Sequence, residues 1–184
     1  RLAQGKRTVL AIDGPCGSGK TTLAALLARL YGCPVFHADD FFLRPEQRTP
    51  ARFAEPGGNL DRERLLEEVL APLRQGQPVS FRRFDCHSLT LLPPVAVAPS
   101  PLAVVEGSYS LHPELAPMYD ITVCLTLSPE LQRRRILARN GEEMARRFFE
   151  RWIPLEQAYF DAMKPQTQCG FLIEADQLSD EAPL

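Results

Sequence analysis

The stretch Gly14–Thr21, GPCGSGKT, constrains the fold and chemistry of this 184-residue chain more than any other segment. It matches the spacing G-x-x-x-x-G-K-[ST] and lies between the apolar run Thr8–Asp13 and a helix-periodic segment that begins at Lys20. Glycines let such a turn curl so that backbone N–H groups point at phosphate oxygens, and the positive end of the following helix strengthens the attraction. The stretch therefore predicts a site for the phosphates of a nucleoside triphosphate.

The side chains of this loop divide the work of binding. In this pattern the lysine, here Lys20, reaches the β and γ phosphates, and the hydroxyl of the next residue, Thr21, binds Mg²⁺. The predicted ligands are thus Mg²⁺ and ATP or GTP. The predicted nucleotide-binding residues are Gly14, Cys16, Gly17, Ser18, Gly19, Lys20, Thr21 and Thr22.

Strand-like and helix-like segments alternate along the rest of the chain. Continuously apolar, β-rich runs occupy residues 34–38, 102–107, 120–128 and 170–175. Helical periodicity occupies residues 59–76 with a cap at Asn59 or Asp61, a segment opened by Ser128 and Pro129, and residues 141–163 with an interruption at Pro154. Buried strands that alternate with helices indicate a mainly parallel sheet with both faces covered. We expect one α/β domain over residues 1–184.

Proline and alternation shape the remaining segments. Residues 43–59 and 89–101 are predicted loops, because their prolines do not fit inside a helix. Residues 78–85 alternate between polar and apolar positions and predict a short strand.

Composition argues against several kinds of partner. A net charge of −2 and a pI near 6.0 provide no overall positive field for nucleic acid or an anionic membrane. No apolar run approaches the roughly 20 residues of a membrane-spanning helix. The five cysteines match no zinc spacing, so we expect reduced thiols in a cytoplasmic protein. The sequence leaves a homo-oligomer open.

The phosphate loop alone does not identify the reaction. A GTPase needs an N-K-x-D motif, and the asparagines Asn59 and Asn140 are not part of one. The S-G-G-Q signature of transporter ATPases is absent, and the chain is short for a motor. A small-molecule kinase fits best.

Two adjacent acids, Asp39 and Asp40, follow the predicted strand at 34–38. In an open parallel sheet this position lies at the carboxyl end of a strand, beside the phosphate loop. A carboxylate there can orient the attacking hydroxyl and accept its proton. A helix cap is the structural alternative for one of the two, and physical reasoning alone does not choose between them as the base. The aromatic residues that follow, Phe41 and Phe42, can wall an acceptor pocket.

The chain resembles the uridine kinase family of P-loop kinases over residues 8 to about 174. The resemblance rests on six segments in order: GPCGSGKTTLA, ADDFF, GGNLDRERLLEEVLAPL, RRFDC, VVEGSY and ERWIPLEQAYF. The segment DDFF followed by Arg-Pro-Glu is also similar to the nicotinamide riboside kinases. The resemblance implies a P-loop NTPase three-layer sandwich, with a mainly parallel five-stranded sheet, helices on both faces and an arginine-rich lid at about 133–151.

The resemblance also implies roles for the acids at the strand ends. Asp39 is the implied base and a water-mediated partner of Mg²⁺, with Asp40 in support. Glu106, at the end of the strand LAVVEG, is implied to hold Mg²⁺ or contact the acceptor, and a salt-bridged structural glutamate is the alternative. The predicted metal ligands are Thr21, Asp39 and Glu106.

The acceptor pocket departs from the family's pattern. Phe84 and Asp85 match it, Cys86 replaces an aromatic residue, and His87 comes early. Arginines 44, 52, 82 and 83 place much positive charge nearby by family position, which leaves an anionic acceptor open. The predicted acceptor-binding residues are Asp39, Asp40, Phe42, Arg82, Phe84, Asp85, His87, Glu106 and Tyr109.

Arginines crowd the implied lid. Arg135 and Arg139 share one helix face at a spacing of i, i+4, and cationic groups stabilise a transferring phosphoryl group. We therefore count Arg135 and Arg139, with Lys20 and Asp39, as the predicted catalytic residues. The segment Trp152–Phe160 is expected to pack the lid onto the core rather than to touch substrate.

Together these features predict a kinase that transfers the γ-phosphoryl group of ATP or GTP to a hydroxyl of a small molecule, with a uridine-like or cytidine-like nucleoside as the first choice. Nicotinamide riboside, pantothenate and an anionic sugar are alternative acceptors. The alternative from another class is a nucleotide-binding regulator that hydrolyses slowly without an acceptor.

Overall fold

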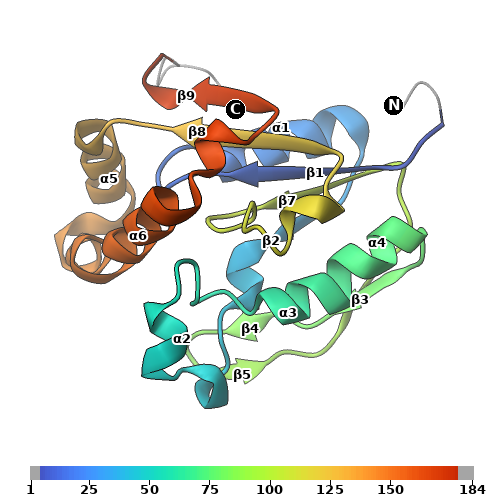
Figure 1. Cartoon of the computed structure of the whole chain (residues 1–184), viewed down its shortest axis with the longest axis horizontal. Helices are drawn as coiled ribbons and strands as arrows, with labels where there is room; N and C mark the ends of the chain where they lie inside the picture. The colour runs from blue at the N-terminus through green and yellow to red at the C-terminus, as the bar shows by residue number, and fades with distance from the viewer. Residues whose placement is uncertain (1–4, 178–184) are drawn as a thin grey trace.

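A five-stranded sheet forms the centre of the protein, whose computed structural model describes residues 5–177 (Figure 1). The strands are β1 (Thr8–Asp13), β2 (Val35–His37), β7 (Leu102–Glu106), β8 (Ile121–Thr126) and β9 (Phe171–Glu174). Their order is β2-β7-β1-β8-β9, and every neighbouring pair is parallel. This arrangement confirms the predicted α/β fold with a parallel five-stranded sheet.

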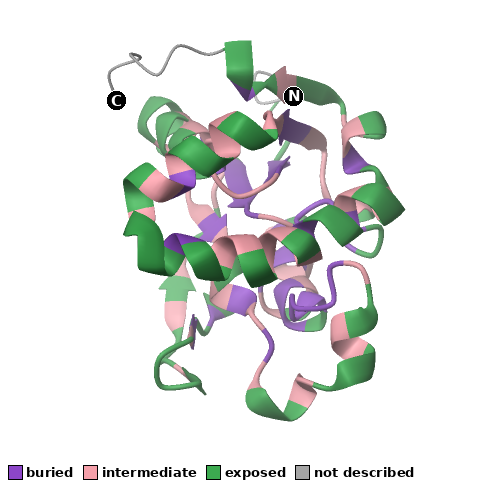
Figure 2. Ribbon diagram, turned by 90° about the vertical axis from the view of Figure 1, so that its left-hand side faces the viewer, coloured by how far each residue is buried: buried purple, intermediate pink, exposed green. Residues whose placement is uncertain are grey.

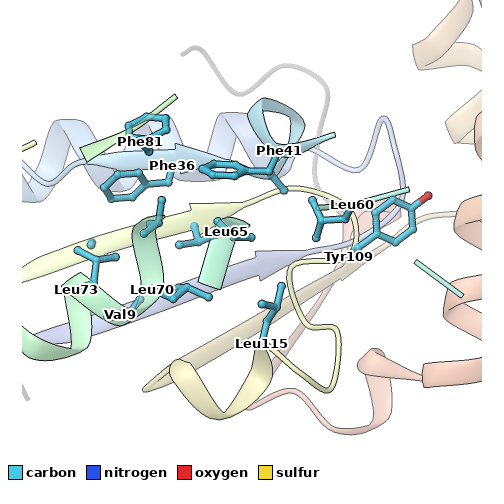
Figure 3. Packing of buried hydrophobic residues seen from close by; sticks show 14 of the residues in the cluster. Val9, Phe36, Phe41, Leu60, Leu65, Leu70, Leu73, Phe81, Tyr109 and Leu115 are labelled. Atoms are coloured by element: carbon cyan, nitrogen blue, oxygen red, sulfur yellow. The ribbon is translucent and has the colours of Figure 1, made fainter. Parts of the chain in front are cut away.

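Helices cover both faces of the sheet, because successive strand residues point to opposite sides. On one face α1 (Lys20–Tyr31) packs on a cluster that includes Leu10, Ile12 and Val104. On the other face lies a larger cluster, part of which Figure 3 shows, that joins Val9 and Phe36 to the helix running from α3 to α4. The outer faces of the helices are largely exposed, whereas buried residues gather along the sheet (Figure 2).

The predicted helix at 59–76 begins behind Asp61, whose side chain accepts the N–H of Arg64 at 3.2 Å. It consists of α3 (Arg62–Leu65), the π-helical turn η4 (Leu66–Leu70) and α4 (Ala71–Gln75). Proline 72 lies just behind the π turn, where the wider hydrogen-bond spacing accommodates its missing N–H. Of the two predicted caps, Asp61 is therefore the one that the structure uses.

The long helical region after Ser128 is divided at Gly141, where the sequence analysis placed the start of its second helical segment. Helix α5 (Pro129–Arg147) contains a non-helical backbone at Gly141, with φ 71°. The π turn η6 (Phe148–Trp152) then leads directly into α6 (Ile153–Met163). Pro154 lies just behind this π turn, whose wider hydrogen-bond spacing accommodates its missing N–H, so the predicted interruption there was wrong.

The predicted loops and the strand at 78–85 are also more structured than expected. The segment 43–59 contains the short helices η3 (Pro45–Gln47) and α2 (Pro50–Ala54). Strands β3 (Val79–Phe81) and β4 (Phe84–Asp85) pair antiparallel with β6 (Val95–Val97) and β5 (Thr90–Leu91) in two small sheets. Pro45 and Pro50 each stand at the start of a short helix, where a missing N–H costs nothing, and the extended backbone of residues 89–101 remains available for strand pairing.

Four further single turns complete the described chain, and these are η2 (Ala38–Phe41), η5 (Ala116–Met118), η7 (Pro165–Thr167) and η8 (Ala175–Gln177). Within residues 5–177, no helix has the length and apolar character needed to cross a membrane.

Candidate active site

The strand order brings three strand ends together beside the phosphate loop. Because β7 lies between β1 and β2, its last residue, Glu106, lies in register with Ile12 on one side and His37 on the other. Glu106 is 4% exposed, and its Oε1 accepts hydrogen bonds from the Thr21 hydroxyl at 3.1 Å and from His37 Nδ1 at 2.6 Å. Glutamate 106 is thus both at the predicted metal position and paired with a histidine that the sequence did not single out.

The phosphate loop takes a backbone shape that requires glycine. Gly19 ends the loop with φ 99° immediately before α1, and a Cβ on Gly14 would lie 2.7 Å from the carbonyl oxygen of Leu125. Lys20 is buried, and its Nζ donates to the carbonyl oxygens of Gly14 at 2.7 Å and Pro15 at 3.0 Å. The lysine charge is therefore fixed at the mouth of the loop.

Asp13 fixes the loop from below and was missed by the sequence analysis. This fully buried carboxylate accepts the N–H groups of Gly14 at 2.6 Å, Tyr109 at 3.2 Å and Leu111 at 2.8 Å, and the Tyr159 hydroxyl at 2.7 Å. Burial raises the pKa of Asp13 to about 6, although these hydrogen bonds act in the opposite direction. One carboxylate thus ties the start of the loop to the chain beyond β7 and to α6.

The two acids after β2 have different surroundings. Asp39 reaches solvent, although the surrounding chain removes part of its water and raises its pKa, an effect that the nearby charge of Lys20 opposes. Asp40 is half-buried, and its Oδ2 lies 3.9 Å from Arg83 Nε, whose charge opposes the rise that burial causes in the Asp40 pKa. Neither side chain caps a helix. Of these two acids, Asp39 is therefore the one whose pKa is lowered by the charge of Lys20.

The acceptor side of these acids is walled by aromatic rings. Phe42 stacks on Trp152 at a centroid distance of 6.4 Å, so the predicted core segment Trp152–Phe160 also reaches this side. Phe84 is buried, and the guanidinium of Arg48 lies over its ring at 5.4 Å.

Three predicted acceptor-binding residues have other roles in the structure. Asp85 caps the turn between β4 and β5, because its carboxylate accepts the N–H of His87 at 2.9 Å and the hydroxyl of Ser88 at 2.7 Å. These hydrogen bonds lower the pKa of Asp85, and His87 lies exposed on the same turn. Tyr109, labelled in Figure 3, is only 3% exposed and belongs to the core cluster. Its ring packs edge-to-face on Tyr159. The carboxylate of Asp85 is thus used by the turn and the ring of Tyr109 by the core, whereas His87 contributes only its N–H to the turn.

Most of the positive charge predicted near the acceptor is balanced by acids. Arg44 pairs with Asp61 at 3.5 Å and Arg52 with Glu63 at 2.7 Å. Within residues 5–177, Arg82 and Arg48 have no acidic partner within salt-bridge distance. Arg82 is exposed, whereas Arg48 is half-buried and held by a hydrogen bond from its Nε to the carbonyl oxygen of Leu43 at 2.9 Å.

Side chains of α5, part of the predicted lid, donate hydrogen bonds to backbone carbonyl oxygens of the phosphate loop. Arg135 Nη1 donates to the oxygen of Gly17 at 3.2 Å, and Gln132 Nε2 donates to that of Cys16 at 3.0 Å. Arg139 is exposed, donates to Asn140 Oδ1 at 2.8 Å and lies over the ring of Phe148. Of the two predicted lid arginines, Arg135 touches the loop directly.

Glu156 is a second functional candidate that the sequence analysis missed. It is 7% exposed, its Oε2 accepts the N–H of Cys16 at 2.9 Å, and its Oε1 accepts the hydroxyl of Ser108 at 2.6 Å. The available signal was an acid on the same helix face as Trp152 and Tyr159, at positions i+4 and i+7 of an otherwise apolar stripe.

The metal prediction can be tested against the oxygen atoms at the loop. The described residues contain no group of three or more His, Cys, Asp or Glu side chains that could hold a metal ion. Thr21 Oγ1 and Glu106 Oε1, 3.1 Å apart, nevertheless form a pair of oxygen donors beside the loop. Such a pair suits Mg²⁺, which takes few protein ligands and completes its shell with phosphate and water.

The pairing of His37 with Glu106 predicts a pH-dependent contribution to stability. The hydrogen bond to Glu106 raises the pKa of His37. A raised folded-state pKa stabilises the fold fully below the unfolded value near 6.5, and the gain disappears as pH rises through the folded value. We expect the free energy of unfolding of the wild type to exceed that of His37→Gln most near pH 5.5, and the difference to vanish in alkali. The difference should stay below about 1 kcal/mol, because the histidine is half-exposed. Urea unfolding at several pH values measures it, and a difference that grew with pH would contradict the pairing.

Comparisons with known proteins find kinases among the similar sequences. A dephospho-CoA kinase of Rhodopseudomonas palustris is 32% identical over 143 residues, covering 72% of this chain and 71% of that protein. Uridine-cytidine kinase D of Dictyostelium discoideum is 27% identical over 64% of this chain and 23% of its own length. No family model matches the sequence.

Solved structures show the same fold. A possible uridine kinase from Bacillus stearothermophilus has a TM-score of 0.70 at 24% identity, covering 91% of this chain and 89% of that one. A putative fructose transport system kinase from Silicibacter sp. TM1040 has a TM-score of 0.71 at 20% identity, covering 94% and 92%.

Proposed function

Because the chain belongs to the P-loop small-molecule kinases, and is thus a phosphotransferase with a hydroxyl acceptor, we propose that it is uridine kinase-like and transfers the γ-phosphoryl group of ATP to a nucleoside. The observation that carries this proposal is the convergence of Lys20, the Thr21–Glu106 pair and Asp39 at adjoining strand ends. These supply a phosphate cation, oxygen donors for Mg²⁺ and a proton acceptor, which are the parts that phosphoryl transfer needs.

The reaction follows from the positions of these groups. The loop N–H groups and Lys20 hold the donor phosphates, and Thr21 and Glu106 would hold Mg²⁺, which neutralises charge on the phosphates when bound. Asp39 orients the acceptor hydroxyl and takes its proton as the oxygen bonds to the γ-phosphorus. The bond from that phosphorus to the bridging oxygen breaks, and ADP leaves. We assign to Arg135 and Arg139 the stabilisation of charge on the transferring group. Both arginines lie in the proposed lid, about residues 133–151, which is part of the same single kinase domain.

The names of the relatives favour two kinds of acceptor. One relative is named for uridine and cytidine, and others are named for dephospho-CoA. We place a nucleoside first, since the walls of Phe42 and Trp152 suit a planar base.

Arg48 favours a second candidate, an acceptor that carries a phosphate or carboxylate. Its guanidinium is half-buried, oriented by Leu43 and Phe84, and lacks an acidic partner among the described residues. A pre-oriented guanidinium is well suited to bind an anion.

The overall proposal is tested by measuring ADP release from MgATP across a panel of acceptors. The panel contains uridine, cytidine, nicotinamide riboside, pantothenate, dephospho-CoA and several sugar phosphates. Stimulation by one acceptor, with the phosphorylated product found by mass spectrometry, would identify the substrate. Slow ADP release that no acceptor stimulates would favour a nucleotide-binding regulator instead.

The role of Arg48 is tested with matched acceptors that differ only by a phosphate group. We expect Arg48→Met to raise the KM for the phosphorylated acceptor by about tenfold to a hundredfold, the loss of one charge-assisted hydrogen bond, and to leave the neutral acceptor unchanged. Arg29→Met, at an exposed position near the end of α1, is the control. An equal effect on both acceptors would show that Arg48 does not recognise the anion.

A further inference from the structure

The carboxylate of Glu156 lies among the groups that the phosphate loop offers to a nucleotide. It accepts the N–H of Cys16, and backbone N–H groups of such loops are the ones that cradle phosphate oxygens. Its other oxygen accepts the hydroxyl of Ser108, which is itself 3.4 Å from Lys20 Nζ. Glu156 thus accepts a hydrogen bond from a backbone N–H of the kind that binds phosphate oxygens.

The charge of Glu156 has no use in the proposed reaction. The charges of Glu106 and Glu156 each raise the pKa of Asp39, so these three carboxylates influence one another. Asp39 serves as the base and Glu106 faces the metal position. Glu156 adds a negative charge at the Cys16 N–H, where it would repel a bound polyphosphate.

Glu156 also links the loop to the lid. Cys16 is held from both sides, since its carbonyl oxygen accepts from Gln132 of α5 and its N–H donates to Glu156 of α6. Because α5 is broken at Gly141, Gln132 lies on the helical segment before the break and Glu156 on the segment after it. Cys16 thus connects both segments to the phosphate loop.

The side chain has space to move away from the loop. A cavity of about 160 Å³ lies between α5, α6 and the end of β8, and Glu156 forms part of its wall together with Pro15 and Gln132. The amides of Gln157 and Gln166 also line it, so a displaced carboxylate would meet polar groups there.

We propose that Glu156 is a positioning residue that competes with the donor's phosphates for the N–H of Cys16, weakens nucleotide binding and speeds the release of ADP. The proposal rests on the proposed function, because it requires that the loop bind a nucleotide. Glu156 accordingly acts on substrate through the loop and takes no part in the transfer itself.

The test replaces Glu156 by glutamine, which keeps the shape and an oxygen for the Cys16 N–H but removes the charge. We expect the Kd of ADP and of ATP to fall about tenfold, with a correspondingly slower ADP release, because the like-charge repulsion is gone. Calorimetry gives the Kd, and stopped-flow displacement of a fluorescent ADP gives the rate. If Glu156 only held the loop in shape, its replacement would instead weaken nucleotide binding and raise the Kd.

Controls separate charge from fold and from the proposed function. The affinity for adenosine, which has no phosphate, should not change in Glu156→Gln, and Glu150→Gln, at an exposed site in η6, should bind ADP like the wild type. Glu156→Met removes the same charge if the glutamine variant does not fold. If the wild type binds ADP but Glu156→Gln and Glu156→Met bind it no more tightly, this inference is wrong and the proposed function is unaffected. A wild type that binds no nucleotide would overturn the proposed function with it.

Discussion

Replacing Asp39 by asparagine should lower kcat for the stimulating acceptor by about a thousandfold, within the range that general base catalysis supplies. Asparagine keeps the size of the side chain but cannot accept the proton of the hydroxyl. The pKa of Asp39 is raised by its surroundings, as expected of a proton acceptor that must also release its proton afterwards. Steady-state kinetics with saturating MgATP measures the effect.

Asp40→Asn is the matched control, since it changes the neighbouring carboxylate to the same amide. Asp40 lies 3.9 Å from Arg83, a distant pair with an exposed arginine, so we expect kcat to change by less than about threefold. The Kd for ATP should remain within about threefold in Asp39→Asn if its role is limited to the acceptor. Equal losses in the two variants would remove the distinction between the acids and, with it, the assignment of Asp39 as the base.

The sequence predicted the parts of this protein that depend on local pattern. Continuous apolar runs indicated the parallel strands, and the loop Gly14–Thr21 indicated a strand on one side and a helix on the other, as found. The start at Asp61 and the division at Gly141 were among the predicted boundaries, whereas the predicted interruption at Pro154 was wrong. Such local signals compete, and tertiary packing decides among them.

Functional residues that depend on distant partners could not be predicted in the same way. Glu156 lies 140 positions from Cys16 in the chain, and nothing in the stripe Trp152–Phe160 indicates that its acid meets the loop. Conversely, Asp85 and Tyr109 have side chains suited to a sugar, yet the turn and the core already occupy them. Residue type shows what a side chain can do, whereas its neighbours determine what remains available to a ligand.

Asp13 shows the same dependence most strongly, and its replacement should have the largest effect on stability. Its Oδ2 accepts from both the Leu111 N–H and the Tyr159 hydroxyl, so in Asp13→Asn an amide NH₂ would face either these two donors or the pair at Oδ1. Buried donors left without an acceptor cost about 1 to 3 kcal/mol each, so we expect a loss of about 3 kcal/mol in the free energy of unfolding. Urea unfolding at pH 7 measures it. Asp161→Asn, at an exposed site on α6, is the control and should change stability by less than about 0.5 kcal/mol.

The pH dependence of this loss distinguishes burial from simple loss of contacts. The pKa of Asp13 is raised to about 6 in the folded protein from an ordinary value near 3.8, so the folded state binds the proton more tightly. The stabilisation that this proton provides is complete below the unfolded value and disappears as pH rises through about 6. Asparagine does not titrate, so the stability difference between wild type and Asp13→Asn should widen between pH 7 and pH 5. A difference that stayed constant over this range would mean that the four hydrogen bonds hold the pKa of Asp13 at or below its ordinary value, against the effect of burial.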